Sequence, residues 1–312
     1  MSKYDCYDED LFGLSEFESD KQALQDRFVI PPFSYFDTRQ DYWQKRKKLW
    51  LKFTGDLSQT RDGEFGKLSN NNKVGLMDTI NNGTSNFDPV LAEIIYRWFC
   101  KPNGKILDPF GGEQTKGVVA NLLGYKYKAV EFRQEQVDLN NNTLLNLGYQ
   151  LSYYCGDSNN ISKIIKDRGF DLCFTSPPYY DLEVYSKEDM SALGTYEEFM
   201  QQYENIFKQC VDMLAENSFL VVKVADIRNK KTGEYRGFVA DNIKMFQKLG
   251  LYFYNDIVLL NAIGTGAFRA NNCMKTRKVV KLHQNILVFY KGDMKKINQL
   301  YPELKELEQW NY

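Results

Sequence analysis

The stretch FTSPPYY, Phe174 to Tyr180, combines residue types that could do chemistry at the end of a strand. Ser176 offers a hydroxyl oxygen, two prolines follow it, and two tyrosines close the stretch. A strand cannot continue through Pro-Pro, because proline lacks an N–H and its ring fixes φ. The stretch therefore predicts a rigid loop that presents oxygen acceptors and an aromatic ring.

Three further predicted strand ends carry carboxylates. DPFGG, Asp108 to Gly112, places an acid before glycines, which let the backbone come close to a ligand. Glu131 ends the next strand about 20 residues on, the arrangement in which a carboxylate binds ribose hydroxyls. Asp157 could accept a hydrogen bond from an adenine amine, or it could cap a local turn. For Asp108 and Glu131 the alternatives are a structural turn and a solvated acid.

Several kinds of site are disfavoured by what the sequence lacks. Neither GxGxxG nor GxxxxGK[ST] occurs, so a dinucleotide or a triphosphate is not favoured. Ribose and adenine contacts without a phosphate-binding loop instead suit S-adenosylmethionine. His283 is the one histidine and no CxxC pair occurs, so no metal site or disulfide framework is predicted. We expect a structural or hydrogen-bonding role for His283.

The elements that must position these residues alternate between strands and helices of about a dozen residues, which predicts a doubly wound, mainly parallel α/β sheet. No helix separates the last two strands, so the final strand is expected to be antiparallel. The predicted fold has about seven strands, helices on both faces, and a site at the carboxyl ends of the strands. The predicted strands are 105–110, 125–132, 151–157, 170–174, 218–227, 251–260 and 283–292. The predicted helices are 40–53, 87–100, 115–124, 133–148, 196–214 and 238–249.

These motifs resemble those of the S-adenosylmethionine-dependent DNA amino-methyltransferases, which share a DPFxGxGT cofactor motif and a catalytic [DNS]PPY motif. The chain has DPFGGEQT and SPPY, and GTSNFDPVLAEII resembles the helix that precedes the cofactor motif in that family. The resemblance covers about 87–292, in the order of the gamma-type enzymes. Residues 27–53 and the DLEVYS segment also look like proteins carried by phages and prophages. One departure is Gln114, which stands where the family has its second glycine.

The resemblance implies a Rossmann-like class I methyltransferase domain at 87–295, after an extension and linker at 1–86 and before a tail at 296–312. Ser176 Oγ and the Pro177 carbonyl would hold the amine, and Tyr179 would stack on a base turned out of the duplex, while the role of Tyr180 is left open. The implied catalytic residues are Ser176, Pro177, Pro178 and Tyr179. The implied cofactor-binding residues are Phe87, Asp108, Pro109, Phe110, Gly112, Thr115, Glu131 and Asp157.

The charge of the chain bears on its partner. With 40 basic and 41 acidic residues, DNA would have to be contacted by local basic patches. Three candidates are Lys45–Lys48 and the loop-like segments Arg228–Arg236 and Arg269–Lys281, each of which could instead be a solvated surface. No apolar run reaches about 18 residues and the N-terminus is polar, so we expect a cytoplasmic bacterial protein, of host or phage origin, without membrane contact.

The expected function is methyl transfer from S-adenosylmethionine to an exocyclic amine of a flipped-out DNA base, as in restriction-modification systems. Serine at the first catalytic position favours N4-cytosine over N6-adenine, by the habit of the family. One alternative is methylation of an amine in RNA or of a protein amide. Another is a non-catalytic DNA-binding protein that retains the fold, which Gln114 suggests. The oligomeric state is left open, a homodimer included.

Overall fold

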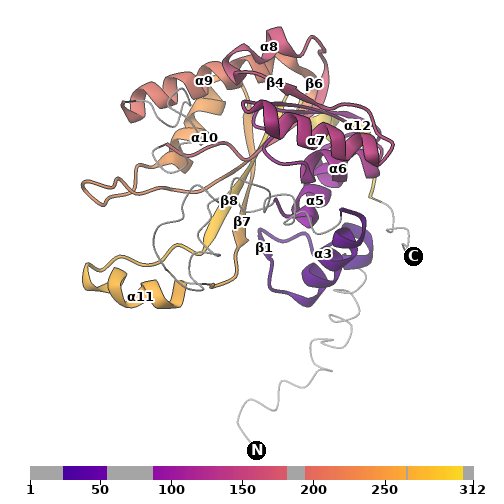
Figure 1. Ribbon diagram of the computed structural model, residues 1–312. Helices are drawn as coiled ribbons and strands as arrows, with labels where there is room; N and C mark the ends of the chain where they lie inside the picture. Colours follow the sequence, from indigo (N-terminus) through magenta and orange to yellow (C-terminus); the bar gives the residue numbers. More distant parts are fainter. Residues whose placement is uncertain (1–23, 55–86, 181–193, 265, 305–312) are drawn as a thin grey trace, which may run out of the picture.

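The computed structural model describes residues 24–54, 87–180, 194–264 and 266–304. Within these ranges one eight-stranded sheet has the order β1-β7-β8-β6-β5-β2-β3-β4 (Figure 1). The strands are β1 Tyr35–Asp37, β2 Lys105–Asp108, β3 Lys126–Glu131, β4 Tyr153–Cys155, β5 Phe170–Thr175, β6 Leu214–Val224, β7 Tyr252–Leu260 and β8 His283–Lys291. The α-helices named below are α3 Asp41–Thr54, α5 Pro89–Phe99, α6 Thr115–Leu122, α7 Gln134–Asn146, α8 Ile161–Ile164, α9 Tyr196–Met213, α10 Phe238–Lys248, α11 Gly266–Lys275 and α12 Ile297–Leu300.

The direction of the strands follows the prediction. Every pair in the described sheet is parallel except the two that involve β8, which runs antiparallel to β6 and to β7. All seven predicted strands are present, and β1 adds an eighth from the N-terminal extension. The predicted mainly parallel α/β fold with an antiparallel last strand is therefore confirmed.

The strand order also fixes where a ligand can bind. The run β4-β3-β2-β5-β6 is, in chain order, the 3-2-1-4-5 arrangement of a doubly wound Rossmann sheet. Such sheets bind ligands outside the carboxyl ends of their strands, at the point where the strand order reverses. Here that point lies between β2 and β5, the strands that end at Asp108 and Thr175.

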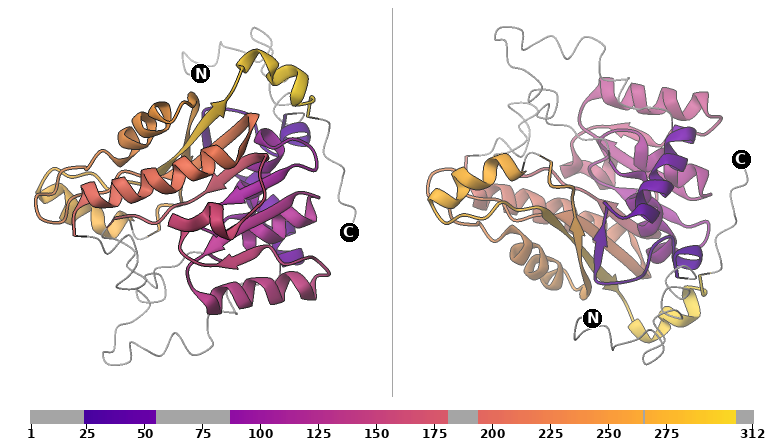
Figure 2. Two further views of the ribbon diagram at one scale, coloured as in Figure 1. Left: turned by 90° about the horizontal axis from the view of Figure 1, so that it is seen from above. Right: turned by 90° about the horizontal axis from the view of Figure 1, so that it is seen from below.

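Successive side chains of the central strands face opposite layers. Ile106 packs into the core beneath α3, α5, α6 and α7, and Leu107 packs into the core beneath α8, α9 and α10. The same alternation separates Leu172 from Cys173 on β5. This period of two is what a strand with both faces covered requires, and it gives the three layers seen in Figures 1 and 2.

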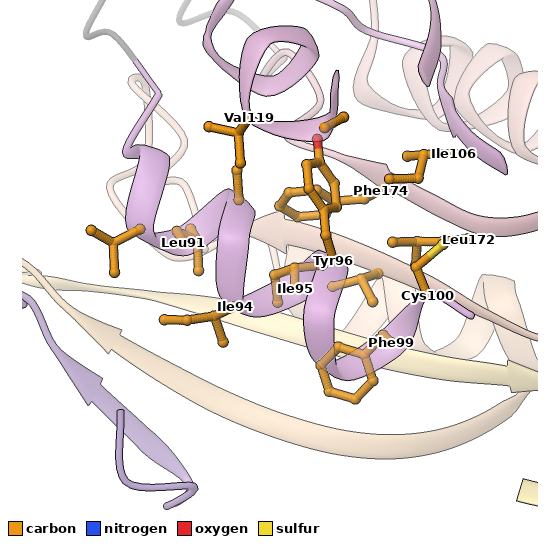
Figure 3. Packing of buried hydrophobic residues seen from close by; sticks show 14 of the residues in the cluster. Leu91, Ile94, Ile95, Tyr96, Phe99, Cys100, Ile106, Val119, Leu172 and Phe174 are labelled. Carbon is orange, nitrogen blue, oxygen red and sulfur yellow. The ribbon is translucent and has the colours of Figure 1, made fainter. Parts of the chain in front are cut away.

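Helix α5 starts and packs as its sequence suggests. The Asp88 side chain accepts a hydrogen bond from the Val90 N–H, which caps the first turn, and Pro89 occupies the first helical position. The apolar face of the helix, which includes Leu91 and Ile95, is buried against the sheet (Figure 3). The helix thereby leads from residue 87, at the carboxyl edge of the sheet, across one of its faces.

The N-terminal extension shares this core. Strand β1 pairs in parallel with β7, and Trp43 and Trp50 of α3 are fully buried in the same apolar cluster as α5. Glu93 on α5 accepts hydrogen bonds from Arg46 and from the Trp50 indole, which joins the two helices. Residue 87 therefore separates two sets of sequence motifs, but the described residues on both sides of it pack into one core.

The largest departures from the predicted elements are a missed helix and an early strand start. The segment Arg269–Lys281 was expected to be loop-like, but its first half belongs to α11. The two asparagines and the basic residues made this segment resemble a loop, although most residues of α11 have ordinary helix propensity. Strand β6 begins at Leu214, where α9 was expected to end, because Leu214 already pairs with Phe170 at the start of β5. Among the described helices, none combines the length and apolarity needed to cross a bilayer.

Candidate active site

The predicted strand-end residues meet at one edge of the sheet. Asp108 ends β2, Glu131 ends β3 and Ser176 follows β5, and these three parallel strands are neighbours in the order β5-β2-β3. Asp157 follows β4, one strand further out. The topology therefore gathers all four predicted loops at the carboxyl edge, with the loops after β2 and β5 at the centre.

Asp108 is fully buried, and its carboxylate is held by protein groups. Oδ1 accepts hydrogen bonds from the Thr175 hydroxyl at 2.6 Å and from the Phe110 N–H at 2.9 Å. Oδ2 accepts from the Tyr127 hydroxyl at 2.6 Å and forms an ion pair with the buried Lys116. Burial and the Asp108 carboxylate raise the pKa of Tyr127 well above its usual value, so its phenol remains a donor. Asp108 thus links the loop after β2 to the last residue of β5.

Glu113 holds the start of α6 in place by accepting hydrogen bonds. Its Oε2 accepts hydrogen bonds from the Thr115 N–H at 2.8 Å and from the Thr115 hydroxyl at 2.7 Å. Its Oε1 accepts from the Phe87 N–H at 2.9 Å. Two of the predicted cofactor residues, Thr115 and Phe87, are therefore positioned by one carboxylate that sequence reasoning did not select.

The turn at Gly112 needs its glycine, and Glu131 braces it. Gly112 has φ +61°, a left-handed conformation that favours glycine, and a Cβ at this position would meet open space. Its N–H donates to Glu131 Oε2 at 3.1 Å. Glu131 Oε1 accepts from the backbone and the side chain of Arg133, both at 3.1 Å. A carboxylate has about four acceptor sites, so Glu131 can still receive a further donor.

Gln114, the departure from the family motif, adopts an ordinary backbone conformation. Its φ of −71° and ψ of −14° lie in the right-handed helical region, and its carbonyl accepts the Val118 N–H. Its side chain is buried. Because the turn requires no positive φ here, replacement of glycine by glutamine does not strain the backbone.

The remaining predicted cofactor residues differ in exposure. The Pro109 carbonyl accepts the Ser158 hydroxyl, and the half-buried Phe110 packs its ring near Phe207, at a centroid distance of 6.1 Å. Asp157 is exposed and caps the 3₁₀ turn Ser158–Asn160, accepting the Asn159 N–H at 2.9 Å. The turn-capping alternative considered for Asp157 therefore describes what its carboxylate does in the structure.

The SPPY loop leaves its serine available. Ser176 is half-buried, and within the part of the chain that the structure describes no group hydrogen-bonds to its hydroxyl. Pro177 is buried and Pro178 is half-buried. Tyr179 is half-buried, with its ring edge-on to Phe238 at 6.1 Å. The loop thus fixes the backbone beside a hydroxyl that a ligand could reach.

Tyr180, whose role the sequence left open, is a packing residue. Its ring is buried between Tyr196 at 5.8 Å and Phe199 at 5.6 Å, and its hydroxyl donates to the Gly194 carbonyl. The Arg236 guanidinium lies over the ring, 4.8 Å from the centroid. These contacts anchor the end of the SPPY loop to α9. The segment DLEVYS that follows lies outside the described residues.

Residues distant in sequence complete the surroundings of the loop. Gln284 at the start of β8 donates to the Tyr179 hydroxyl at 3.4 Å. The neighbouring His283 Nε2 lies 3.2 Å from Lys281 Nζ, and burial together with the Lys281 charge lowers the pKa of His283. A neutral imidazole in this position fits the expected hydrogen-bonding role. No local pattern signalled Gln284, whereas Thr175, a polar residue that ends an apolar strand, could have been selected from the sequence.

Fold and site together define a class. A Rossmann sheet with an antiparallel last strand between β6 and β7, and with an SPPY loop at its switch point, is the arrangement of class I methyltransferases. Within the described residues no cluster of histidine, cysteine and acidic side chains could hold a metal ion.

Comparison with known proteins narrows the class. Residues 170–311 match the N6/N4 methyltransferase family model described as DNA methylase. The predicted resemblance to the S-adenosylmethionine-dependent DNA amino-methyltransferases is thereby confirmed for this part of the chain. The match supports S-adenosylmethionine as the cofactor. A phage origin stays a prediction.

Individual relatives are more distant. Over 133 residues the chain is 29% identical to the Type II beta methyltransferase M.BslI of Bacillus sp. strain NEB-606. The aligned region spans 40% of this chain and 14% of the length of that protein. A methyltransferase from Pyrococcus furiosus superposes with a TM-score of 0.46 and 14% identity, over 80% of this chain and 100% of that one. TrmN from Thermus thermophilus gives a TM-score of 0.44 and 14% identity, over 66% and 49% of the two chains.

Proposed function

We propose that the protein transfers a methyl group from S-adenosylmethionine to an exocyclic amine of a DNA base that has been turned out of the duplex. The observation that carries the proposal is the Ser176 hydroxyl. It has no hydrogen-bond partner among the described residues, and it follows Thr175, whose own hydroxyl is bonded to Asp108 in the cofactor loop. A polar group available at the switch point, beside the loop of the cofactor motif, is what an amine substrate would need.

The residues around the cofactor loop fit S-adenosylmethionine. The open space beside Gly112 permits close approach to the backbone, and the carboxylate of Glu131 has acceptor capacity left for ribose hydroxyls. Phe87 is held at the edge of the site by Glu113, and its ring packs edge-on against Phe174 at 5.6 Å. When bound, S-adenosylmethionine supplies a methyl group on a sulfonium whose sulfur is the leaving group, so no covalent enzyme intermediate is needed.

The SPPY loop would act on the amine. An exocyclic amine is a weak nucleophile because its lone pair is delocalised into the ring. Ser176 Oγ and the Pro177 carbonyl would accept its two hydrogen bonds, which favours a tetrahedral nitrogen and stabilises the positive charge that develops there. Because Pro177 and Pro178 restrict the backbone, these acceptors are preorganised at little entropic cost. The nitrogen then loses one proton to solvent.

The base must first leave the helix, at a cost of a few kcal/mol. Tyr179 is half-buried, so part of its ring is accessible for stacking on the flipped base, which contributes about 1–3 kcal/mol. The contacts of Tyr179 with Phe238 and Gln284 hold the ring in place before the base arrives. We favour N4-cytosine over N6-adenine, since the family more often pairs serine at the first catalytic position with cytosine.

A methyl-transfer assay with tritiated S-adenosylmethionine tests the proposal. Mixed-sequence duplex DNA, RNA and protein are offered separately, and labelled DNA is digested so that N4-methylcytosine and N6-methyladenine can be distinguished by chromatography. We expect label in one DNA base. Ser176→Ala should reduce transfer by about 10²–10³-fold, the range seen when one preorganised hydrogen-bonding group is removed from a catalytic site.

Ser218→Ala is the matched control, because Ser218 is a buried serine near the start of β6, at the other end of the sheet, where its hydroxyl donates to the Ala215 carbonyl at 2.7 Å. It should retain transfer. Label in RNA alone or in protein alone would contradict DNA as the substrate and identify the labelled molecule as the substrate instead. No transfer to any substrate, with no binding of S-adenosylmethionine by calorimetry, would favour a non-catalytic protein.

A further inference from the structure

Two basic segments that are far apart in sequence lie against each other. The first is the hairpin 228–236, closed by a β-bridge between Arg228 and Tyr235. The second, called here the basic arm, comprises residues 266–282 and begins with α11. Lys281 Nζ lies 5.7 Å from the centre of the Tyr235 ring, and Lys278 Nζ lies against Gly233. Both segments project from the same side of the molecule, on the left of Figure 1 and of the left view in Figure 2.

The joint surface concentrates positive charge in a chain whose net charge is only −1. Its cations are Arg228, Lys230, Lys231, Arg236, Arg269, Lys275, Arg277, Lys278 and Lys281, and its one acid is Glu234. The basic arm contains no acid. Charges of one sign held together in this way create a field that attracts a polyanion.

The third basic patch of the sequence behaves differently. On α3, Lys45 pairs with Asp41 at 2.6 Å, Arg46 with the buried Glu93, and Lys47 with Asp88 at 3.0 Å. Within the described residues, the five cations of the basic arm form no ion pair. Three of the four cations in the α3 patch Lys45–Lys48 are therefore compensated within the fold, whereas the charge of the arm is available to a partner.

The arm is attached beside the SPPY loop. It connects β7 to β8 at the carboxyl edge, where Leu260 pairs with His283, and the next residue, Gln284, contacts Tyr179. On the hairpin side, Arg236 lies over Tyr180. The positive surface thus borders both tyrosines of the loop, which is where the duplex would flank a base that enters the site.

The arm also exposes apolar side chains. Phe268, in the first turn of α11, is 73% exposed, and Val279 is 67% exposed. Proteins that distort DNA often insert an apolar side chain between bases while cations hold the phosphates. A large aromatic ring in the first turn of a cationic helix fits that combination better than it fits a protein partner, which would need an acidic surface around an apolar centre.

We propose that the hairpin and the basic arm form one surface that holds duplex DNA beside the target base, with the cations on phosphates and Phe268 against the bases. This inference rests on the proposed function, because it assumes that DNA is the substrate. Phosphate contacts carry no sequence information, so this surface would set affinity and orientation.

The test compares two variants that remove equal charge. The arm variant carries Arg269→Gln, Lys275→Gln and Lys278→Gln. The control carries Lys45→Gln, Lys48→Gln and Lys52→Gln on exposed positions of α3. Binding of a fluorescent mixed-sequence duplex is measured by anisotropy over a series of salt concentrations. Each phosphate contact contributes about 0.9 to the slope of log K against log salt, so the arm variant should lose about 2–3 in slope and at least tenfold in affinity.

The control should bind like the unmodified protein. Equal losses in both variants, or none in the arm variant, would overturn the assignment, as would tighter binding of RNA than of duplex DNA. Phe268→Ala should weaken binding about three- to tenfold with the salt slope unchanged, because base contacts release no counterions, and Val279→Ala should have little effect. If DNA binds through the arm with the expected salt dependence but no methyl transfer occurs, the proposed function is contradicted and the proposed DNA-binding surface stands.

Discussion

The loops that follow β2 and β5 leave the same edge of the sheet, yet they use their polar atoms in different ways. Asp108 at the end of β2 and Glu113 in the loop that follows are both buried, and protein donors hold both oxygens of each carboxylate. In the second loop the half-buried Ser176 hydroxyl has no partner within the described residues. A buried charge must be paired inside the fold, whereas leaving a hydroxyl near the surface without a protein partner costs little free energy.

This contrast shows that a carboxylate in a sequence motif can serve the fold instead of the ligand. The sequence suggested that Asp108 contacts the cofactor, but its two oxygens already receive four protein groups. We propose that Asp108 is a positioning residue, which holds the loop of Gly112 against the end of β5. Glu131, with fewer donors and an edge position, is the better candidate for a direct contact.

The largest expected effect comes from breaking the buried pair. Asp108→Ala leaves the Lys116 ammonium without its counter-charge, so we expect a loss of about 3–5 kcal/mol in the free energy of unfolding. Chemical denaturation measures it. Asp157→Ala removes only an exposed cap and should cost about 1 kcal/mol. Similar losses in the two variants would show that the Asp108 network does not stabilise the fold as its geometry suggests.

A smaller effect is expected from Thr175→Val, which keeps the shape of the side chain and removes its hydrogen bond to Asp108. One buried acceptor loses a donor, so stability should fall by about 1–3 kcal/mol. Methyl transfer should fall as well, because the bond that ties the SPPY loop to the cofactor loop is gone. Thr175→Ser restores the hydroxyl and should recover most of both quantities; a serine variant as impaired as the valine variant would point to packing instead.

The smallest effect on stability is expected from Ser176→Ala. The hydroxyl has no partner among the described residues, so the free energy of unfolding should change by no more than about 0.5 kcal/mol. The affinity for S-adenosylmethionine, measured by calorimetry, should also stay the same while turnover falls. A loss of stability comparable to that of Thr175→Val would mean that the serine is structural, and the contrast between the two loops would disappear.

Local patterns in the sequence carried much of the fold. Short apolar segments separated by helical segments predicted all seven strands after residue 87, and Asp88-Pro89 marked the start of α5. The short β1 was missed, because three residues are too few to show a period, and α11 was missed because its charge and asparagines resemble a loop. Elements of this size are decided by what they pack against.

The site divides in the same way. Local sequence was enough to place carboxylates, glycines and an SPPY loop at strand ends, because proline fixes φ and glycine permits tight turns. The packing of the chain was needed to show that Asp108 is hydrogen-bonded to Thr175 and that Arg236 lies over Tyr180. It also showed that the cations of the arm form no ion pair within the described residues, whereas Lys45, Arg46 and Lys47 of α3 are paired. Those outcomes depend on which side chains become neighbours across the sheet, and burial then forces a carboxylate to find partners that no local pattern names.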